Sequence, residues 1–134
     1  MEVGNVVRIN TPLMPFHYGK VAKVVKIEND GIIYPITLDR PSECGTLKTT
    51  VYNENELLFF AESSEDFAWF IVTKHPAVKT MILEGTLFYG MTVRELALAW
   101  KIFFHIANPD YEDAFSIFLE GAISLGNKII RRGY

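Results

Sequence analysis

The spacing of apolar residues changes near residue 60, and this change limits the possible folds more than any other feature of the sequence. Before it, apolar side chains recur at every second position, as over residues 32–38, which is the period of a half-buried strand. After it, they recur at intervals of three and four, which is the period of an amphipathic helix. We therefore predict an α+β protein with strands over residues 1–61 and helices over residues 62–134.

Several short strands account for the first region. We expect them in "VGNVVRI" from residue 3, "KVAKVVKIE" from residue 20, "LKTTVY" from residue 47 and "NENELLFF" from residue 53, besides the stretch 32–38. Asn29, Asp30 and Gly31 favour a tight turn because these residues accept the backbone angles that a hairpin needs. Pro35 lacks an N–H group and predicts an edge strand or a bulge.

Three helices are expected in the second region. The first follows Ser63 or Ser64 and ends near His75, before Pro76. The second spans residues 93–107 and starts with a capping box formed by Thr92 and Glu95. The third spans residues 110–126, and its period predicts one face formed by Phe115, Phe118, Leu119, Ala122 and Ile123. The segment 76–91 fits a short helix or a short strand, so the region holds three to four helices.

The strand pattern is similar to that of a known fold. The series "VGNVVRI … HYGKVAKVVKI … GIIYPITLD … NENELLFF" over residues 3–60 resembles the KOW type of SH3-like barrel. In that pattern a glycine opens the second strand, as Gly19 does here, whereas Ala22 stands where a further glycine is common. The resemblance implies a small N-terminal SH3-like β-barrel over these residues. We expect the helical bundle to follow it and the two regions to form one compact unit. Such barrels bind RNA, ribosomal components, polymerase partners or peptides, so the fold does not define a function.

Composition excludes several classes of protein. The 134 residues carry 13 basic and 16 acidic side chains, a net charge of −3, which does not favour nucleic-acid binding through bulk charge. Cys44 is the only cysteine, so no intrachain disulfide forms, as expected in a reducing compartment. The first residues lack the features of a signal peptide, and no apolar run reaches the length of a membrane span. We predict a cytoplasmic protein without a membrane partner.

No motif for metal, cofactor or covalent catalysis occurs. His17, His75 and His105 lie far apart in sequence, and the chain lacks zinc-binding spacings and glycine-rich phosphate loops. We therefore expect no metal and no cofactor. Two acidic clusters, at residues 62–66 and 110–113, stand at predicted helix starts, where negative charge stabilises the helix dipole. An enzyme with a site near Cys44 or the histidines is the least favoured alternative.

The segment "TPLMPFHYGK" at residues 11–20 is unusually apolar for a loop. Either its side chains fold back onto the protein, or they contact a partner, for which aromatic residues and methionine are well suited. The tryptophan of helix 93–107 is a second possible anchor. The candidate partner-binding residues are Leu13, Met14, Phe16, His17, Tyr18 and Trp100.

Helix 93–107 is apolar around most of its circumference. Its polar side chains are Arg94, Glu95, Lys101 and His105, and all but Glu95 follow one narrow stripe. Such a helix is central to the fold or covered by a partner, which makes a homodimer plausible. The favoured function is a non-catalytic protein-interaction or regulatory module that binds a protein partner through the apolar loop and helix surface.

A KOW-like module that binds RNA or DNA is the main alternative. Strict alternation along the second strand places Lys20 and Lys26 on one face and Lys23 on the other. The candidate nucleic-acid-binding residues are Lys20, Lys23, Lys26, Arg40 and Lys48.

Overall fold

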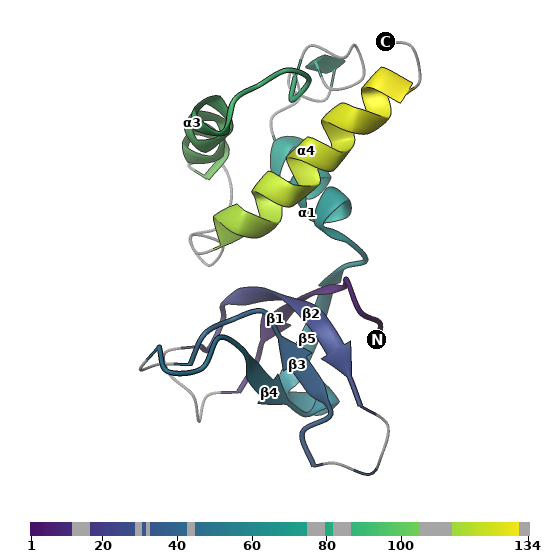
Figure 1. Ribbon diagram of the computed structural model, residues 1–134, viewed down its shortest axis with the longest axis vertical. Helices are drawn as coiled ribbons and strands as arrows, with labels where there is room; N and C mark the ends of the chain where they lie inside the picture. Colours follow the sequence, from purple (N-terminus) through teal and green to yellow (C-terminus); the bar gives the residue numbers. More distant parts are fainter. Residues whose placement is uncertain are drawn as a thin grey trace. The chain divides into compact units, whose positions relative to one another are not determined.

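A computed structural model describes residues 1–11, 17–28, 31, 33–42, 45–74, 80–81, 87–104 and 114–131. The chain divides into two compact units, residues 1–63 (unit 1) and residues 64–134 (unit 2). Unit 1 contains the strands and unit 2 contains the helices (Figure 1). The predicted α+β class and the change of structure near residue 60 are therefore confirmed.

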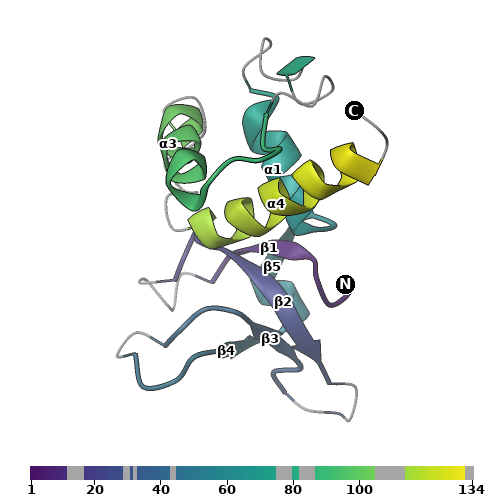
Figure 2. The same cartoon turned by 45° about the horizontal axis from the view of Figure 1, so that its top comes forward.

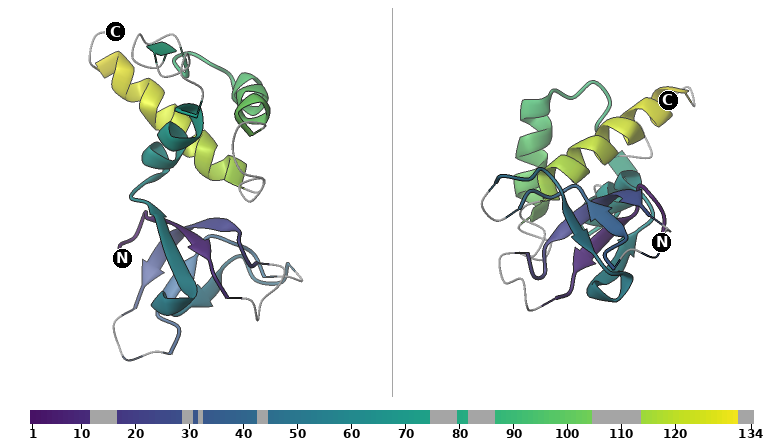
Figure 3. Two further views of the ribbon diagram at one scale, coloured as in Figure 1. Left: turned by 180° about the vertical axis from the view of Figure 1, so that it is seen from behind. Right: turned by 60° about the horizontal axis from the view of Figure 1, so that its bottom comes forward.

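Unit 1 is a curved antiparallel sheet of five strands. They are β1 (Val6–Ile9), β2 (Val21–Ile27), β3 (Ile36–Leu38), β4 (Thr50–Tyr52) and β5 (Leu57–Ala61), and a 3₁₀ turn, η1 (Glu54–Glu56), joins the last two. The strand order is β4-β3-β2-β1-β5, and Figure 3 shows β5 beside β1. Among the described residues β4 and β5 do not pair, so the hydrogen-bonded sheet is open and the predicted barrel is not confirmed.

The third strand is shorter than its alternating pattern predicts. β3 begins at Ile36, directly after Pro35, because proline has no N–H group to donate to the ladder. Ile33 and Tyr34, which precede it, are exposed. The alternation itself holds from there, since Ile36 and Leu38 are buried while Thr37 is half-buried.

The predicted position of Lys26 was wrong, because β2 contains a bulge. Val24 pairs with Leu38 and Lys26 with Thr37, so one extra residue lies on β2, and Ile27 then pairs with Ile36. Strict alternation would place Lys26 on the face of the buried Ala22 and Val24. The bulge shifts the alternation by one residue, so Ile27 packs on the core and Lys26 is exposed.

The core of unit 1 combines side chains from all five strands. It comprises Val7, Ile9, Ala22, Val24, Ile36, Leu38, Tyr52 and Leu57. Asn5, which is buried, links the first residues to the end of the sheet. Its Oδ1 accepts a hydrogen bond from the Glu2 N–H (2.9 Å), and its Nδ2 donates to the Glu62 carbonyl (3.1 Å).

Within its described residues, unit 2 has three helices, α1 (Ser64–Val72), α3 (Val93–Phe104) and α4 (Phe115–Arg131). The predicted capping box is confirmed at α3. The Thr92 N–H donates to Glu95 Oε1 (3.1 Å), and the Glu95 N–H donates to Thr92 Oγ1 (3.2 Å). α4 continues beyond the predicted end at residue 126. Residues 75–79, 82–86 and 105–113, which include parts of the predicted helices, lie outside the described residues.

The close contact between α1 and α4 sets which face of α4 is buried (Figure 2). Gly121 lies against the backbone of Ser64, where a Cβ atom would overlap the carbonyl group and approach Ala68 Cβ to 2.9 Å. The buried stripe therefore runs through Ile117, Phe118 and Ala122, and Ile123 is exposed. The predicted apolar face was wrong at Ile123, because the contact at a residue without a side chain determines the rotation of the helix.

Candidate functional site

Residues 12–16 of the apolar loop, which include Leu13, Met14 and Phe16, lie outside the described residues. His17 is only 4% exposed. Its Nδ1 accepts a hydrogen bond from Arg40 Nε at 2.8 Å, so this nitrogen carries no proton. This hydrogen bond attaches the end of the loop, at the buried His17, to Arg40 within unit 1. Tyr18, the next residue, is exposed.

Trp100 lies in the core of unit 2, not on its surface. Its ring is 5.0 Å from that of Phe118, 6.2 Å from that of Phe115 and 6.4 Å from that of Phe67, measured between centroids. The side chain is buried. The core position corrects the expectation of a tryptophan anchor for a partner, because the ring is already covered by its own unit.

The candidate nucleic-acid residues include two that are engaged within unit 1. Lys26 Nζ is 2.7 Å from Glu28 Oε1, and this hydrogen bond and charge raise the pKa of Lys26. Arg40 donates to His17. Lys20 and Lys23 are half-buried, and Lys48 is exposed. The arrangement offers no specific support for a phosphate-binding surface, which needs clustered cations that face the ligand.

The described part of the chain shows no cluster of metal-binding side chains. Cys44, His75 and His105 lie outside the described residues, and within the described ranges no three His, Cys, Asp or Glu side chains converge. In the first acidic cluster, Glu65 joins two helices. Its Oε1 accepts from Ser124 Oγ (2.7 Å), and its Oε2 accepts from Lys128 Nζ (2.6 Å). Glu65 therefore stands at the start of α1, as expected, and it also links α1 to α4.

Two hydroxyl groups are buried in the core of unit 1. Neither Tyr52 Oη nor Thr50 Oγ1 has a hydrogen-bond partner among the described residues. Burial raises the pKa of Tyr52, because the charged phenolate would lose its hydration. Both residues stand on β4, where Tyr52 is fully buried and Thr50 is half-buried, so we expect them to affect the stability of unit 1.

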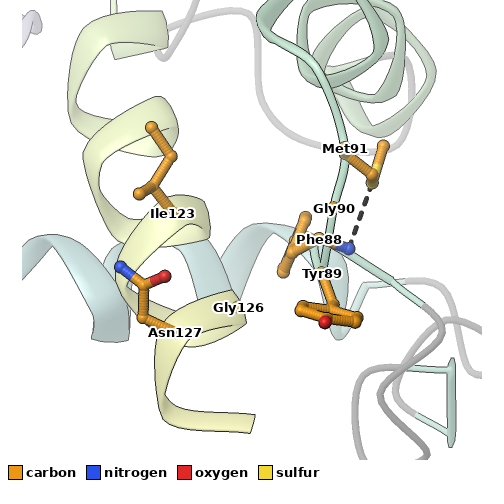
Figure 4. Close-up of a pocket in the computed structure, with 7 residues that line it drawn as sticks. All are labelled: Phe88, Tyr89, Gly90, Met91, Ile123, Gly126 and Asn127. Carbon is orange, nitrogen blue, oxygen red and sulfur yellow. Dashed lines mark hydrogen bonds between the residues drawn. The ribbon is translucent and has the colours of Figure 1, made fainter. Parts of the chain in front are cut away.

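A pocket of about 250 Å³ lies in unit 2, between the turn that precedes α3 and the second half of α4 (Figure 4). Phe88, Tyr89, Gly90 and Met91 form one wall, and Ile123, Gly126 and Asn127 form the other. The volume is below that of a site for a drug-sized molecule. It suits one large side chain or a comparable apolar group.

The turn that forms the first wall has an unusual backbone. Phe88 has φ 71°, which is rare for a bulky residue and costs roughly 1–3 kcal/mol. Local contacts hold it there: its N–H donates to Met91 Sδ (3.0 Å), and its carbonyl accepts from the Met91 N–H (3.2 Å). The Phe88 ring packs edge-on against that of Phe118 at 5.9 Å.

The second wall approaches this turn most closely at Gly126. A Cβ atom there would lie 3.3 Å from the carbonyl carbon and oxygen of Phe88. At the rim, Tyr89 is 51% and Ile123 is 46% exposed. Asn127, also exposed, adds an amide that both donates and accepts hydrogen bonds. The described lining offers apolar contacts and hydrogen bonds, and its one titratable group is the Tyr89 hydroxyl.

Sequence reasoning missed this pocket. Its first wall falls in the segment that fits either a helix or a strand, and the other wall lies on a helix more than thirty residues later. The run "LFYGM" at residues 87–91 carried a partial signal, because a glycine among large apolar residues indicates a turn. Nothing in the run indicates that α4 completes the site.

The outward side of α3 is a second exposed apolar surface. Leu98 is 55% and Ile102 is 59% exposed, and Arg94 and Lys101 stand beside them. We name these four residues the outer face of α3. The opposite side of the helix carries the buried Leu96, Ala99, Trp100 and Phe103. The expectation that this helix has excess apolar surface is met by Leu98 and Ile102.

Comparisons with known proteins do not add a candidate function. The sequence matches no protein-family model, and no curated protein matches it. Among the described helices, none has the length and apolar character that crossing a bilayer requires.

Proposed function

We propose that the chain is a non-catalytic protein-interaction or regulatory module and that the pocket of unit 2 binds a large apolar side chain of a partner protein. The observation that carries this proposal is the pocket wall at Phe88, where an unfavourable backbone conformation is held in place by several contacts. Strained residues that persist in a fold concentrate at binding and switch sites. A wall fixed before binding also reduces the ordering cost of complex formation.

The chemistry of the lining supports a peptide ligand. Binding energy in protein interfaces concentrates in a few large side chains that fill pockets. The exposed Tyr89 and Ile123 would lose water on either side of such an anchor, and Asn127 could bond the main chain that carries it. The partner expected from this site presents one Leu, Met or aromatic residue in an accessible segment.

Selection of ligands from a random peptide library displayed on phage tests this function. We expect the full chain to enrich peptides that share one large apolar residue, with Kd values in roughly the micromolar range for synthetic copies. Tyr89→Ala and Ile123→Asp are expected to weaken their binding about tenfold, because each change removes part of the pocket rim. Fluorescence anisotropy measures the effect.

Tyr34→Ala is the matched control, because Tyr34 is 49% exposed but lies in unit 1. It should leave the affinity unchanged. Enriched peptides that bind the Tyr89 and Ile123 variants as tightly as the parent chain would refute the pocket as the site. If no peptide is enriched at all, the proposed function itself is wrong.

We also propose that unit 1 is a small SH3-like barrel of the KOW type, with its sheet open between β4 and β5. Three observations support this assignment: the meander from β1 to β4, the 3₁₀ turn before β5, and the return of β5 to the side of β1. Gly19 has φ 80° two residues before the start of β2, at the position where the KOW pattern has its glycine. An NMR structure of the full chain with another strand order would contradict the assignment.

A further inference from the structure

We propose that the outer face of α3 is a second docking surface, which binds an acidic and apolar segment of a partner protein. The proposal rests on the proposed function, because it assigns a chemical class to a partner of an interaction module. It uses residues distinct from those of the pocket.

The apolar part of the surface is the pair Leu98 and Ile102. They are four residues apart, so they lie one above the other on the same side of the helix. More than half of each side chain is exposed. α3 already buries its other side in unit 2, so its stability does not explain why two large aliphatic residues lie on the outward side.

The charged part is the pair Arg94 and Lys101. They are seven residues apart, about two helical turns, and therefore border the aliphatic pair on the same side. Both are exposed. In the part of the chain that the structure describes, neither side chain forms an ion pair or a hydrogen bond.

Four other cationic side chains of the chain contact groups of the protein itself. Lys26 binds Glu28, Lys128 binds Glu65, and Arg40 donates to His17. Lys74 lies 4.4 Å from the centre of the Phe70 ring. Two cations without such partners, beside exposed Leu and Ile, distinguish the outer face of α3 from these sites.

Charge complementarity selects the occupant. A segment with carboxylates about two helical turns apart, bordering its own apolar residues, would pair with both cations and cover both aliphatic side chains. A nucleic acid would supply phosphates but leave Leu98 and Ile102 in contact with water. A second copy of the chain would bring two further cations to a surface that already carries two.

A library of helical peptides tests this inference with the full chain. The peptides, of about 18 residues, keep one Leu stripe, and the positions that border it vary among Glu, Lys, Gln and Ala. We expect selection of Glu on one border and a fall in affinity of about tenfold between roughly 50 mM and roughly 300 mM salt.

The charge-reversed variant Arg94→Glu/Lys101→Glu should weaken the selected peptides about tenfold and shift the selection toward Lys. The control Lys48→Glu/Lys74→Glu changes the net charge equally at other sites and should leave both unchanged. Circular dichroism of each variant verifies that the helices are retained.

The inference is overturned if the borders show no preference for Glu, if charge reversal has no effect, or if no member of the library binds. It is also overturned if light scattering shows a dimer that Ile102→Asp dissociates, because a second copy then occupies the face. Peptides that bind the pocket in the earlier selection would leave the proposed function standing in each of these cases. Failure of both selections would remove the proposed function as well.

Discussion

Gly121→Ala should destabilise unit 2, although alanine favours helices. In an exposed helix interior this change stabilises by about 1 kcal/mol. At Gly121 the new Cβ would lie 2.5 Å from the Ser64 carbonyl carbon and 2.9 Å from Ala68 Cβ, whereas ordinary contact begins near 3.4 Å. The obstacle is backbone, so α1 and α4 must move apart. Overpacking of this kind costs about 3 kcal/mol at the upper end of its usual range.

The difference of these terms predicts a net loss of about 2 kcal/mol in the free energy of unfolding. For a domain of the size of unit 2, the loss corresponds to a decrease in Tm of roughly 8–16 °C. Urea and thermal unfolding followed by circular dichroism at 222 nm measure it, because this signal reports mainly on helices.

Gly126→Ala is the matched control on the same helix. It brings the same gain in helix propensity, but its Cβ would meet Phe88 at 3.3 Å, a distance that a small adjustment relieves. We expect its stability to lie within about 1 kcal/mol of the parent chain. The close contact of α1 with α4 would be refuted if Gly121→Ala were as stable as Gly126→Ala.

Three further predictions concern other contacts. Burial raises the pKa of Tyr52 above 10.0, so the unfolded chain ionises first and the free energy of unfolding falls as pH rises through and above about 10. Tyr52→Phe should reduce this fall, measured by urea unfolding at neutral and alkaline pH, and equal pH slopes for Tyr52→Phe and the exposed control Tyr34→Phe would contradict the argument. Thr92→Ala should cost about 1 kcal/mol by loss of the α3 cap, whereas Thr92→Ser should retain most of the stability; equal unfolding midpoints would contradict the capping role. Lys128→Met should cost less than about 1 kcal/mol, and less at high salt, because the Lys128 side chain is 54% exposed in its pair with Glu65; a larger loss that salt leaves unchanged would point to packing.

Sequence reasoning succeeded where a structure depends on neighbouring residues. The cap of α3 needs only Thr92 and Glu95, three positions apart, and both hydrogen bonds form. The burial of Ile36 and Leu38 follows from local alternation. The exposed position of Lys26 does not, because the bulge in β2 depends on the pairing with β3.

The candidate site could be predicted only in part. Excess apolar surface on α3 was evident from its composition, and Leu98 and Ile102 account for it. The burial of Trp100 against Phe118 and the approach of Phe88 to Gly126 depend on how three helices pack. Contacts between distant segments set these positions, and no spacing within one segment encodes them.

The contact between α1 and α4 also has a consequence for synthesis of the chain. Glu65 and Ser124, which it joins, are 59 residues apart. Ribosomes add about 5–20 residues per second, so Glu65 of α1 is synthesised roughly 3–12 seconds before Ser124 of its partner helix. Unit 1 is fully translated before this interval begins. During it α4 is absent, while α1 already carries Phe67, Ala68 and Ile71, which the complete fold buries. A nascent chain stalled before residue 114 should therefore bind chaperones that recognise apolar segments.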